Sequence, residues 1–281
     1  MAKSSAISAK TDSIDAVKKL YVIKIGGNVI DNSQNLHQFL KDFTALDGYK
    51  ILVHGGGKVA TDLSETMGIE TRVVDGRRIT DIETLRVVTM VYGGLINKNI
   101  VAQLQRYGTN AIGLTGADGD LIRAEKRPVK TIDYGFVGDV DETSVNIKGV
   151  ASLMSAGFTP VFCALTHDGG GQLLNTNADT IASVLAVALA KMYPTTLVYC
   201  FEKKGVLMDI NDEDSIIRDI NPERYEELKT KQIIHSGMLP KLDNAFTAIA
   251  CGVKAVLIGH AGEIGSLQQN KSFGTRLSTY P

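Results

Sequence analysis

The chain contains no tryptophan, six prolines and three cysteines in 281 residues. It also lacks an excess of charge of either sign, with 30 Lys and Arg residues against 31 Asp and Glu residues. The absence of a basic excess argues against a nucleic-acid partner, and the absence of an acidic tail argues against disorder. With 44% hydrophobic residues, the chain is long enough for a large core, and we expect a globular protein that acts on small molecules.

The few cysteines, Cys163, Cys200 and Cys251, do not form a recognisable set. Their number is odd and their spacings are long, which excludes a disulfide framework and a zinc-binding pattern. Each lies in an apolar run, so we expect three buried thiols in a reducing compartment.

Long hydrophobic runs are also missing. The first ten residues, MAKSSAISAK, contain no apolar stretch typical of a signal peptide. The longest apolar segment, Ile181–Ala190, is far shorter than the roughly 20 residues that a membrane helix needs. We therefore expect a cytoplasmic protein without a membrane partner.

Apolar runs and helical patterns alternate along most of the chain, and several of the runs end in glycine. The expected strands are 20–27, 49–57, 110–119, 159–165, 195–201 and 255–260, and the expected helices are 34–46, 58–67, 81–107, 147–156, 177–191, 222–232 and 240–251. Residues 122–146 indicate hairpins, and residues 1–18 a frayed segment or short arm. Such alternation is typical of an α/β fold with a mostly parallel sheet covered on both faces, where ligands bind at the carboxyl ends of the strands.

Two glycine turns close expected strands, Lys24-Ile25-Gly26-Gly27 and His54-Gly55-Gly56-Gly57. Without Cβ atoms, successive N–H groups can point into one concavity and bind phosphate or carboxylate oxygens. Neither turn matches a Walker A loop or a dinucleotide-binding fingerprint. The alternative is that both are ordinary tight turns. This alternative is less favoured because both turns lie at the ends of expected strands.

Two lysines occupy positions where a lysine is unusual. Lys24 lies within an apolar strand, and lysine is rarely buried without a partner. Lys241 follows Pro240 at an expected helix start, where a cation opposes the helix dipole unless an anion binds there. Both patterns indicate cations directed at phosphate. The alternatives are a lysine that reaches solvent from an edge strand and an ordinary solvated lysine.

Three polar residues, Asn175, Asn177 and Asp179, precede the strongly apolar helix expected from residue 177. Helix capping explains one or two of them, since Asn and Asp are good N-caps. We interpret Asp179 as a carboxylate that can hold the two lysines in position.

Six segments together resemble those of the amino-acid kinase superfamily, and most closely the N-acetylglutamate kinases. They are KIGG, VHGGGKVATDL, DGRRIT, GLTGADG, GQLLNTNAD and GMLPKLDNA, in the family's order, within residues 20–265. The resemblance implies an open, mostly parallel αβα sandwich of the amino-acid kinase type with two lobes. It divides the chain into an N-terminal arm (1–19), a lobe that binds the acyl amino acid (20–190) and a lobe that binds ATP (191–281).

The resemblance also assigns roles to particular residues. Lys24 and Lys241 correspond to the lysines that neutralise the transferring phosphoryl group, Asp179 to the aspartate that orients both, and Gly27 to a backbone donor to that group. The implied substrate-binding residues are Gly55, Gly56, Arg78, Asn175 and Asn177, and the implied ATP-binding residues are Lys24, Gly26, Gly27, Gly205, Gly237 and Lys241. Arg78 is preferred to Arg77 because the family pattern is Gly-x-Arg-hydrophobic-Thr; a surface salt bridge is the alternative for either arginine.

One segment departs from the family pattern. The family usually has Ser/Thr-Asp-Val-x-Gly-Val after the first strand of the ATP lobe, whereas this chain has Cys200-Phe201-Glu202-Lys203-Lys204-Gly205-Val206. Gly205 and Val206 are kept, but the hydroxyl and the aspartate are not. The adenine and ribose contacts are therefore expected to differ from those of the family.

The implied activity is ATP-dependent phosphorylation of the γ-carboxylate of an N-acyl-L-glutamate, with N-acetylglutamate favoured, in arginine biosynthesis. ATP is the co-substrate, and Mg²⁺ is expected to be held mainly by the ATP phosphates, with no metal site on the protein. Two alternatives stay open: a sibling kinase that uses another carboxylate or acyl group, such as N-succinylglutamate, and a non-catalytic ligand sensor. The tail SFGTRL resembles that of the uninhibited, dimeric members of the family, whereas arginine-inhibited members carry a long N-terminal helix that builds a hexamer. The resemblance therefore implies a homodimer without arginine feedback rather than a hexamer, since the helical pattern before the first expected strand is weak and short.

Overall fold

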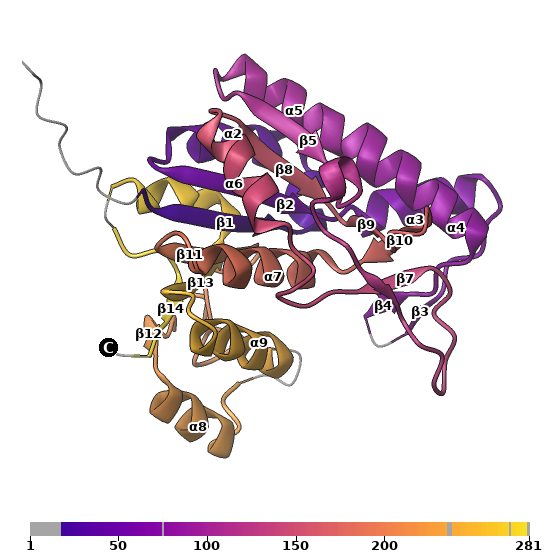
Figure 1. The fold of residues 1–281 in the computed structure, drawn as a ribbon. Helices are drawn as coiled ribbons and strands as arrows, with labels where there is room; N and C mark the ends of the chain where they lie inside the picture. The colour runs from indigo at the N-terminus through magenta and orange to yellow at the C-terminus, as the bar shows by residue number, and fades with distance from the viewer. Residues whose placement is uncertain (1–17, 75, 235–237, 270, 280–281) are drawn as a thin grey trace, which may run out of the picture.

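The chain folds around an eight-stranded, mostly parallel sheet with the strand order β12-β14-β13-β11-β1-β2-β8-β5 (Figure 1). The computed structural model describes residues 18–74, 76–234, 238–269 and 271–279. The sheet strands are β1 (Leu20–Ile25), β2 (Tyr49–His54), β5 (Ala111–Leu114), β8 (Thr159–Cys163), β11 (Thr195–Phe201), β12 (Asp219–Ile220), β13 (Ala255–His260) and β14 (Thr275–Leu277). The β13–β14 pair is antiparallel, and the other neighbours are parallel.

Two smaller sheets lie beside the main one. Four strands form the larger of them in the order β6-β7-β10-β9, and an antiparallel hairpin forms the other. Their strands are β6 (Glu125–Lys126), β7 (Val137–Asp139), β9 (Leu165–His167), β10 (Leu173–Thr176), and the hairpin strands β3 (Val73–Val74) and β4 (Arg77–Arg78).

Helices cover both faces of the central sheet, and a separate hydrophobic core lies between the sheet and the helices on each face. On one face lie α2 (Ser33–Ala45), α3 (Gly57–Thr66), α4 (Ile82–Val88), the π-helical η1 (Thr89–Ile96), α5 (Asn97–Arg106) and the 3₁₀-helical η3 (Ala261–Leu267). On the other lie α6 (Ile147–Ser155), α7 (Ala178–Ala190), α8 (Pro222–Thr230) and α9 (Leu239–Ala250). Two short helices, α1 (Gly27–Ile30) and η2 (Asp118–Asp120), follow β1 and β5. The αβα sandwich expected from the sequence is confirmed.

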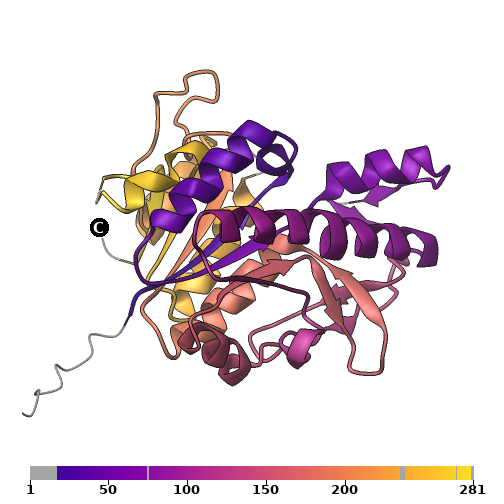
Figure 2. The same ribbon diagram turned by 90° about the horizontal axis from the view of Figure 1, so that it is seen from above.

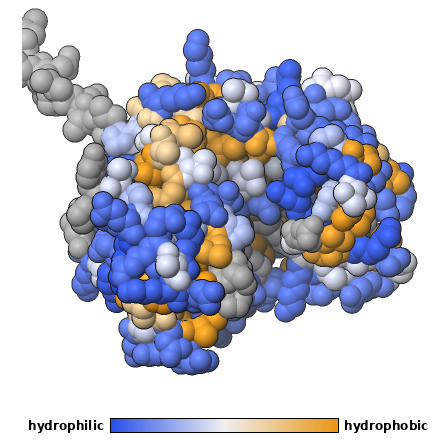
Figure 3. Space-filling view, turned by 90° about the horizontal axis from the view of Figure 1, so that it is seen from below, coloured by the Kyte–Doolittle hydropathy of each residue, from blue (hydrophilic) through white to orange (hydrophobic). Residues whose placement is uncertain are grey.

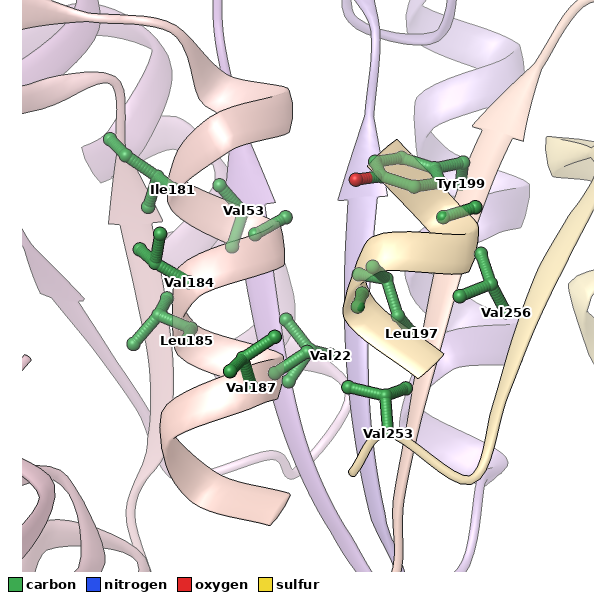
Figure 4. Close-up of a cluster of buried hydrophobic side chains, with 14 of the residues drawn as sticks. Val22, Val53, Ile181, Val184, Leu185, Val187, Leu197, Tyr199, Val253 and Val256 are labelled. Atoms are coloured by element: carbon green, nitrogen blue, oxygen red, sulfur yellow. The ribbon is translucent and has the colours of Figure 1, made fainter. Parts of the chain in front are cut away.

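The alternation of side chains along β1 decides which face Lys24 joins. Leu20 and Val22 pack into the core under α7, whereas Ile23 and Ile25 pack into the opposite core. Since successive strand residues point to opposite faces, Lys24 lies on the α7 side. Figure 4 shows this core, in which the apolar helix α7 packs over β1 and β2.

The long helix expected over 81–107 forms, but its middle is a π-helix, η1, which contains Gly93 and Gly94. Viewed from above, the α4–η1–α5 rod crosses the molecule (Figure 2). The wider π turns carry Tyr92 and Ile96 against the glycine turn after β2, as the close approach of both side chains to Gly56 shows. Single π segments inside α-helices often mark functional sites.

The prediction of three buried thiols was wrong for one of them. Cys163 and Cys200 are buried in the sheet, but Cys251 is exposed. It is the C-cap of α9, one residue beyond the end of the helix. Its apolar neighbours Ala248 and Ile249 face the core from the preceding turn, so the apolar run does not carry Cys251 inward.

The N-terminal arm lies almost wholly outside the described residues, as does Gly237. Among the residues that the structure describes, no helix is both long and apolar enough to cross a membrane.

Candidate active site

The carboxyl end of β1 and the first turn of α7 meet in an ion pair. Lys24 Nζ lies 2.8 Å from Asp179 Oδ1, and the lysine side chain is only 12% exposed. Asn177 caps α7 by accepting hydrogen bonds from the N–H groups of Asp179 and Thr180. The cap sets the start of the helix so that Asp179 lies in its first turn, facing the strand that carries Lys24.

Lys241 lies in the first turn of α9, where its side chain is half-buried. Burial lowers the pKa of Lys241 most; Asp179 raises it, and Lys24 lowers it again. The two cations are thus close enough to repel each other, and the Asp179 carboxylate, which pairs with Lys24, is close enough to act on both. A site with an excess of positive charge at low solvent exposure favours a polyanionic ligand.

A cavity of about 450 Å³ opens beside Lys241. It is lined by Gly26, Gly27, Asn28, Val29, Cys200, Phe201, Glu202, Lys203, Gly205, Val206, Leu207, Ile210, Ile233, Ile234, Met238, Lys241 and Ile258. The lining combines glycine backbone and lysine side chains with many apolar side chains. This combination suits a ligand with a phosphate end and a flat apolar end, as a nucleotide has.

A second cavity, of about 260 Å³, lies beside the glycine turn that follows β2. Its lining comprises Gly55, Gly56, Gly57, Val73, Gly76, Arg77, Arg78, Tyr92, Val137, Ala164, Asn175, Thr176, Asn177 and Ala178. Ala178 immediately precedes Asp179, and Gly26 of the first cavity lies two residues after Lys24, so the Lys24–Asp179 pair adjoins both cavities. In the view from below, the surface is hollowed between the α8–α9 part and the part with the β3–β4 hairpin (Figure 3).

The positive charge of the second cavity comes from two of its lining residues, Arg77 and Arg78. Arg78 is anchored to α3. Its Nη2 donates hydrogen bonds to the Gly57 carbonyl and to Thr61 Oγ1, both at 2.8 Å. Its Nη1 is buried and has no hydrogen-bond partner among the described residues. A guanidinium that is held at one nitrogen and unsatisfied at another is suited to a carboxylate of the ligand.

Gly56 requires the absence of a side chain. Its φ is +152°, and a Cβ atom there would lie 2.2 Å from Ile96 Cδ1 and 3.1 Å from a Tyr92 ring carbon. The same residue is the N-cap of α3 and offers no capping side chain. The first N–H groups of α3 therefore stay available to an anion.

A buried hydrogen-bond network of His54 and Asn97 supports the glycine turn that follows β2. His54 is fully buried, and Nδ1 lies 2.8 Å from the Gly55 carbonyl while Nε2 lies 3.1 Å from Asn97 Nδ2. The carbonyl needs a donor and the amide nitrogen donates, so the proton belongs on Nδ1. Burial lowers the pKa of His54 to about 4, which keeps the ring neutral. Asn97 Nδ2 also donates to the Val161 carbonyl at 2.9 Å, so the network joins α5, β2 and β8.

The structure brings most of the expected site residues to these two cavities. Asn175 lines the second cavity, and its side-chain amide donates a hydrogen bond to Thr80 Oγ1 at 3.0 Å. Gly205 lines the first, and it also packs so closely that a Cβ would lie 2.7 Å from Thr275 Oγ1. Within the described ranges, no group of three or more His, Cys, Asp and Glu residues is placed to hold a metal ion.

Three residues at the site had no role in the sequence analysis. Tyr92 and Ile96 press on Gly56 from η1, and Phe201 faces both lysines. Phe201 directly follows Cys200 in the segment that differs from the family pattern. That difference was the one feature of the sequence that could have pointed to a role for Phe201. Tyr92 and Ile96 carried no such signal, because a helical pattern does not reveal a π turn.

An αβα sandwich with glycine turns at the carboxyl ends of β1 and β2 is typical of proteins that bind phosphorylated ligands at that edge of the sheet. Comparison with known families identifies which class of such proteins this is. The chain belongs to the amino acid kinase family, whose model matches residues 19–260.

Within that family, its curated relatives include acetylglutamate kinases. One from Cytophaga hutchinsonii is 59% identical over 263 residues, which are 93% of this chain and 99% of the relative. Another, from Phocaeicola vulgatus, is 58% identical and covers 88% of this chain and 95% of its own. A crystal structure of N-acetylglutamate synthase from Neisseria gonorrhoeae, complexed with coenzyme A and N-acetyl-glutamate, has a TM-score of 0.78 at 19% identity. That likeness covers 94% of this chain and 60% of the other, and it concerns the fold alone.

Proposed function

We propose that this protein transfers the γ-phosphoryl group of ATP to the γ-carboxylate of N-acetyl-L-glutamate, a step of arginine biosynthesis. The observation that carries the proposal is the Lys24–Asp179 ion pair, whose chain neighbours Gly26 and Ala178 each line one of the two cavities. One cavity has the lining for a nucleotide, and the other has Arg78 for a carboxylate. The identity to acetylglutamate kinases supports the choice of acceptor.

The acceptor needs no general base. A carboxylate with an ordinary pKa of about 4.3 is ionised at neutral pH and attacks without losing a proton. The buried and neutral His54 is bonded to Gly55 and Asn97 and is not required to take one. A sensor without catalytic function would be expected to lack a lysine or the aspartate, and this chain has all three.

The chemical problem is instead the approach of two anions. Lys24 and Lys241 would neutralise charge on the transferring phosphoryl group, and Asp179 would keep both cations in place. Backbone N–H groups at Gly27 and Gly56 would bind its oxygens. Preorganised cations and N–H donors of this kind act mainly by positioning and electrostatic stabilisation.

The substrates would divide between the two cavities. Gly26, Gly27, Gly205 and Lys241 would contact ATP, which enters as its Mg²⁺ complex with the metal held mainly by phosphates and water. Gly55, Gly56 and Arg78 would contact the acyl amino acid, together with Asn175 and Asn177. Gly237, also proposed for ATP, lies outside the described residues.

At the level of the whole chain, we propose an acyl-amino-acid lobe over 20–190 and an ATP lobe over 191–281. The nucleotide cavity takes part of its wall from each segment, which would place phosphoryl transfer at their junction. We further propose a cytoplasmic homodimer, in a compartment where the free thiols of Cys163, Cys200 and Cys251 stay reduced.

The test is an assay of the purified chain with Mg-ATP and N-acetyl-L-glutamate, in which hydroxylamine traps the acyl phosphate as a hydroxamate. We expect ADP and hydroxamate in equal amounts. Parallel reactions with free L-glutamate and N-succinyl-L-glutamate identify the acceptor. ADP without hydroxamate, or hydroxamate only from another acceptor, would overturn the proposal.

A further inference from the structure

The ring of Phe201 lies against both lysines of the site. Its centroid is 4.1 Å from Lys241 Nζ and 5.8 Å from Lys24 Nζ. Both distances are within the approximately 6 Å over which an ammonium group is attracted to the face of an aromatic ring. One neutral side chain therefore contacts two cations that come from different elements, β1 and α9.

The backbone explains why this ring reaches them. Lys24 is paired with Tyr199 in the β1–β11 register, so both side chains lie on the α7 face of the sheet. Phe201 lies two residues further along β11 and returns to the same face. It is the last residue of the strand, at the edge where the cavity opens.

Phe201 is itself held in place. Its ring stacks on that of Tyr199, with centroids 6.1 Å apart and an interplanar angle of 22°. The Tyr199 hydroxyl donates to the backbone carbonyl of Asp179 at 3.3 Å. The ring that faces the lysines is thus linked, through one tyrosine, to the residue that pairs with Lys24.

We infer that Phe201 is a positioning residue for phosphoryl transfer, whose ring face keeps the Lys24 and Lys241 ammonium groups directed into the nucleotide cavity. The inference rests on the proposed function. The negative face of the ring offsets part of the repulsion between the two cations. Because the ring carries no net charge, it does not compete with phosphate for them, as a second carboxylate would.

An electrostatic role of the Phe201 ring and a purely steric one predict different effects of fluorination. Fluorine atoms on the ring withdraw electron density from its face with little change in size. We expect kcat to fall stepwise when Phe201 is replaced by 4-fluoro-, 3,5-difluoro- and 3,4,5-trifluorophenylalanine. Phe201→Leu, which removes the ring, should lower kcat by about 3- to 30-fold. Phe201→Tyr should retain most activity, and the KM for N-acetylglutamate should stay unchanged throughout.

Two results would overturn the inference. One is a kcat that is the same across the fluorinated series while Phe201→Leu is impaired, which would make the ring an apolar wall only. The other is a change confined to the KM for Mg-ATP, which would make it a contact of the nucleotide. Failure of the proposed function is separate, since then the unmodified protein would form no hydroxamate. The fluorinated variants are nearly isosteric, so misfolding does not confuse the comparison.

Discussion

The two lysines of the site carry positive charges at partly buried positions, where the charge does not help the chain to fold. Lys24 and Lys241 share one carboxylate and repel each other, an arrangement that a bound polyanion would relieve. We predict that Lys24→Ala and Lys241→Ala each lower kcat by about 10²–10³, the usual effect of removing one preorganised electrostatic contact. Steady-state kinetics with Mg-ATP and N-acetylglutamate measures the loss.

The matched control is Lys254→Ala, since Lys254 is exposed on the turn after α9. It should keep normal kcat. Circular dichroism and thermal unfolding should show that all three variants are folded. If either site variant turned over at the rate of the control, the role given to that lysine would be wrong.

The buried imidazole of His54 makes a prediction about stability rather than rate. Its folded-state pKa, about 4, is lower than the ordinary value of about 6.5, so below pH 6.5 the unfolded chain binds the proton more readily. Stability therefore falls as the pH drops from 6.5 towards 4, by about 2–3 kcal/mol in total from this residue. Urea unfolding at several pH values should show this slope for the native protein.

The variant His54→Gln isolates the contribution of the histidine, because the carboxylates titrate alike in both proteins. We expect the native protein to lose about 2–3 kcal/mol more than the variant between pH 7 and pH 4. Parallel pH curves for the two proteins would mean that the ring is accessible to protons in the folded state.

At the scale of elements, the contact between η1 and the β2–α3 turn can be tested with a pair of glycines. Gly56→Ala would force a methyl group against Ile96 and Tyr92 at a positive φ, and we expect it to destabilise the protein by about 2–4 kcal/mol. It should also raise the KM for N-acetylglutamate, since the turn lines that cavity. Urea unfolding and kinetics measure the two effects.

Gly94→Ala is the control within η1, because no atom of the residues that the structure describes lies within 4 Å of its added Cβ. It should leave stability unchanged or raise it by up to about 1 kcal/mol, since alanine restricts the unfolded chain more than glycine does. Equal destabilisation by both substitutions would show that η1 tolerates no added methyl group and that the Gly56 contact is not special.

The same elements show what could be predicted from the sequence. Apolar runs identified the strands on either side of β1, and the Asn177 cap and Pro240 identified where α7 and α9 begin, because these signals are local. The π turns of η1 could not be predicted, since Gly93 and Gly94 are compatible with an α-helix. The contact of Phe201 with two lysines depends on the register of β1 with β11, which no local pattern contains.

At the scale of the whole molecule, the nucleotide cavity takes residues from both proposed lobes, Gly26 and Gly27 from one and Gly205 and Lys241 from the other. The non-hydrolysable analogue AMP-PNP with Mg²⁺ should therefore stabilise the entire chain rather than one segment. At 100 times its Kd, it should add about 2.7 kcal/mol. Urea unfolding should then remain a single transition at a higher midpoint; two separate transitions, with only one shifted by the ligand, would contradict the shared cavity.

The outer surface of the α4–η1–α5 rod bears on the proposed homodimer. Two large apolar side chains of η1, Met90 and Leu95, are 49% and 53% exposed. We take this surface as the candidate interface of the proposed homodimer, because exposed apolar surface marks protein–protein contact sites. We expect sedimentation velocity to give a species of twice the 30.2 kDa chain mass, unchanged by added arginine. Met90→Lys with Leu95→Lys should shift it towards the monomer. A hexamer, or a mass that changes with arginine, would contradict the dimer, and a dimer that persists in the double variant would place its interface elsewhere.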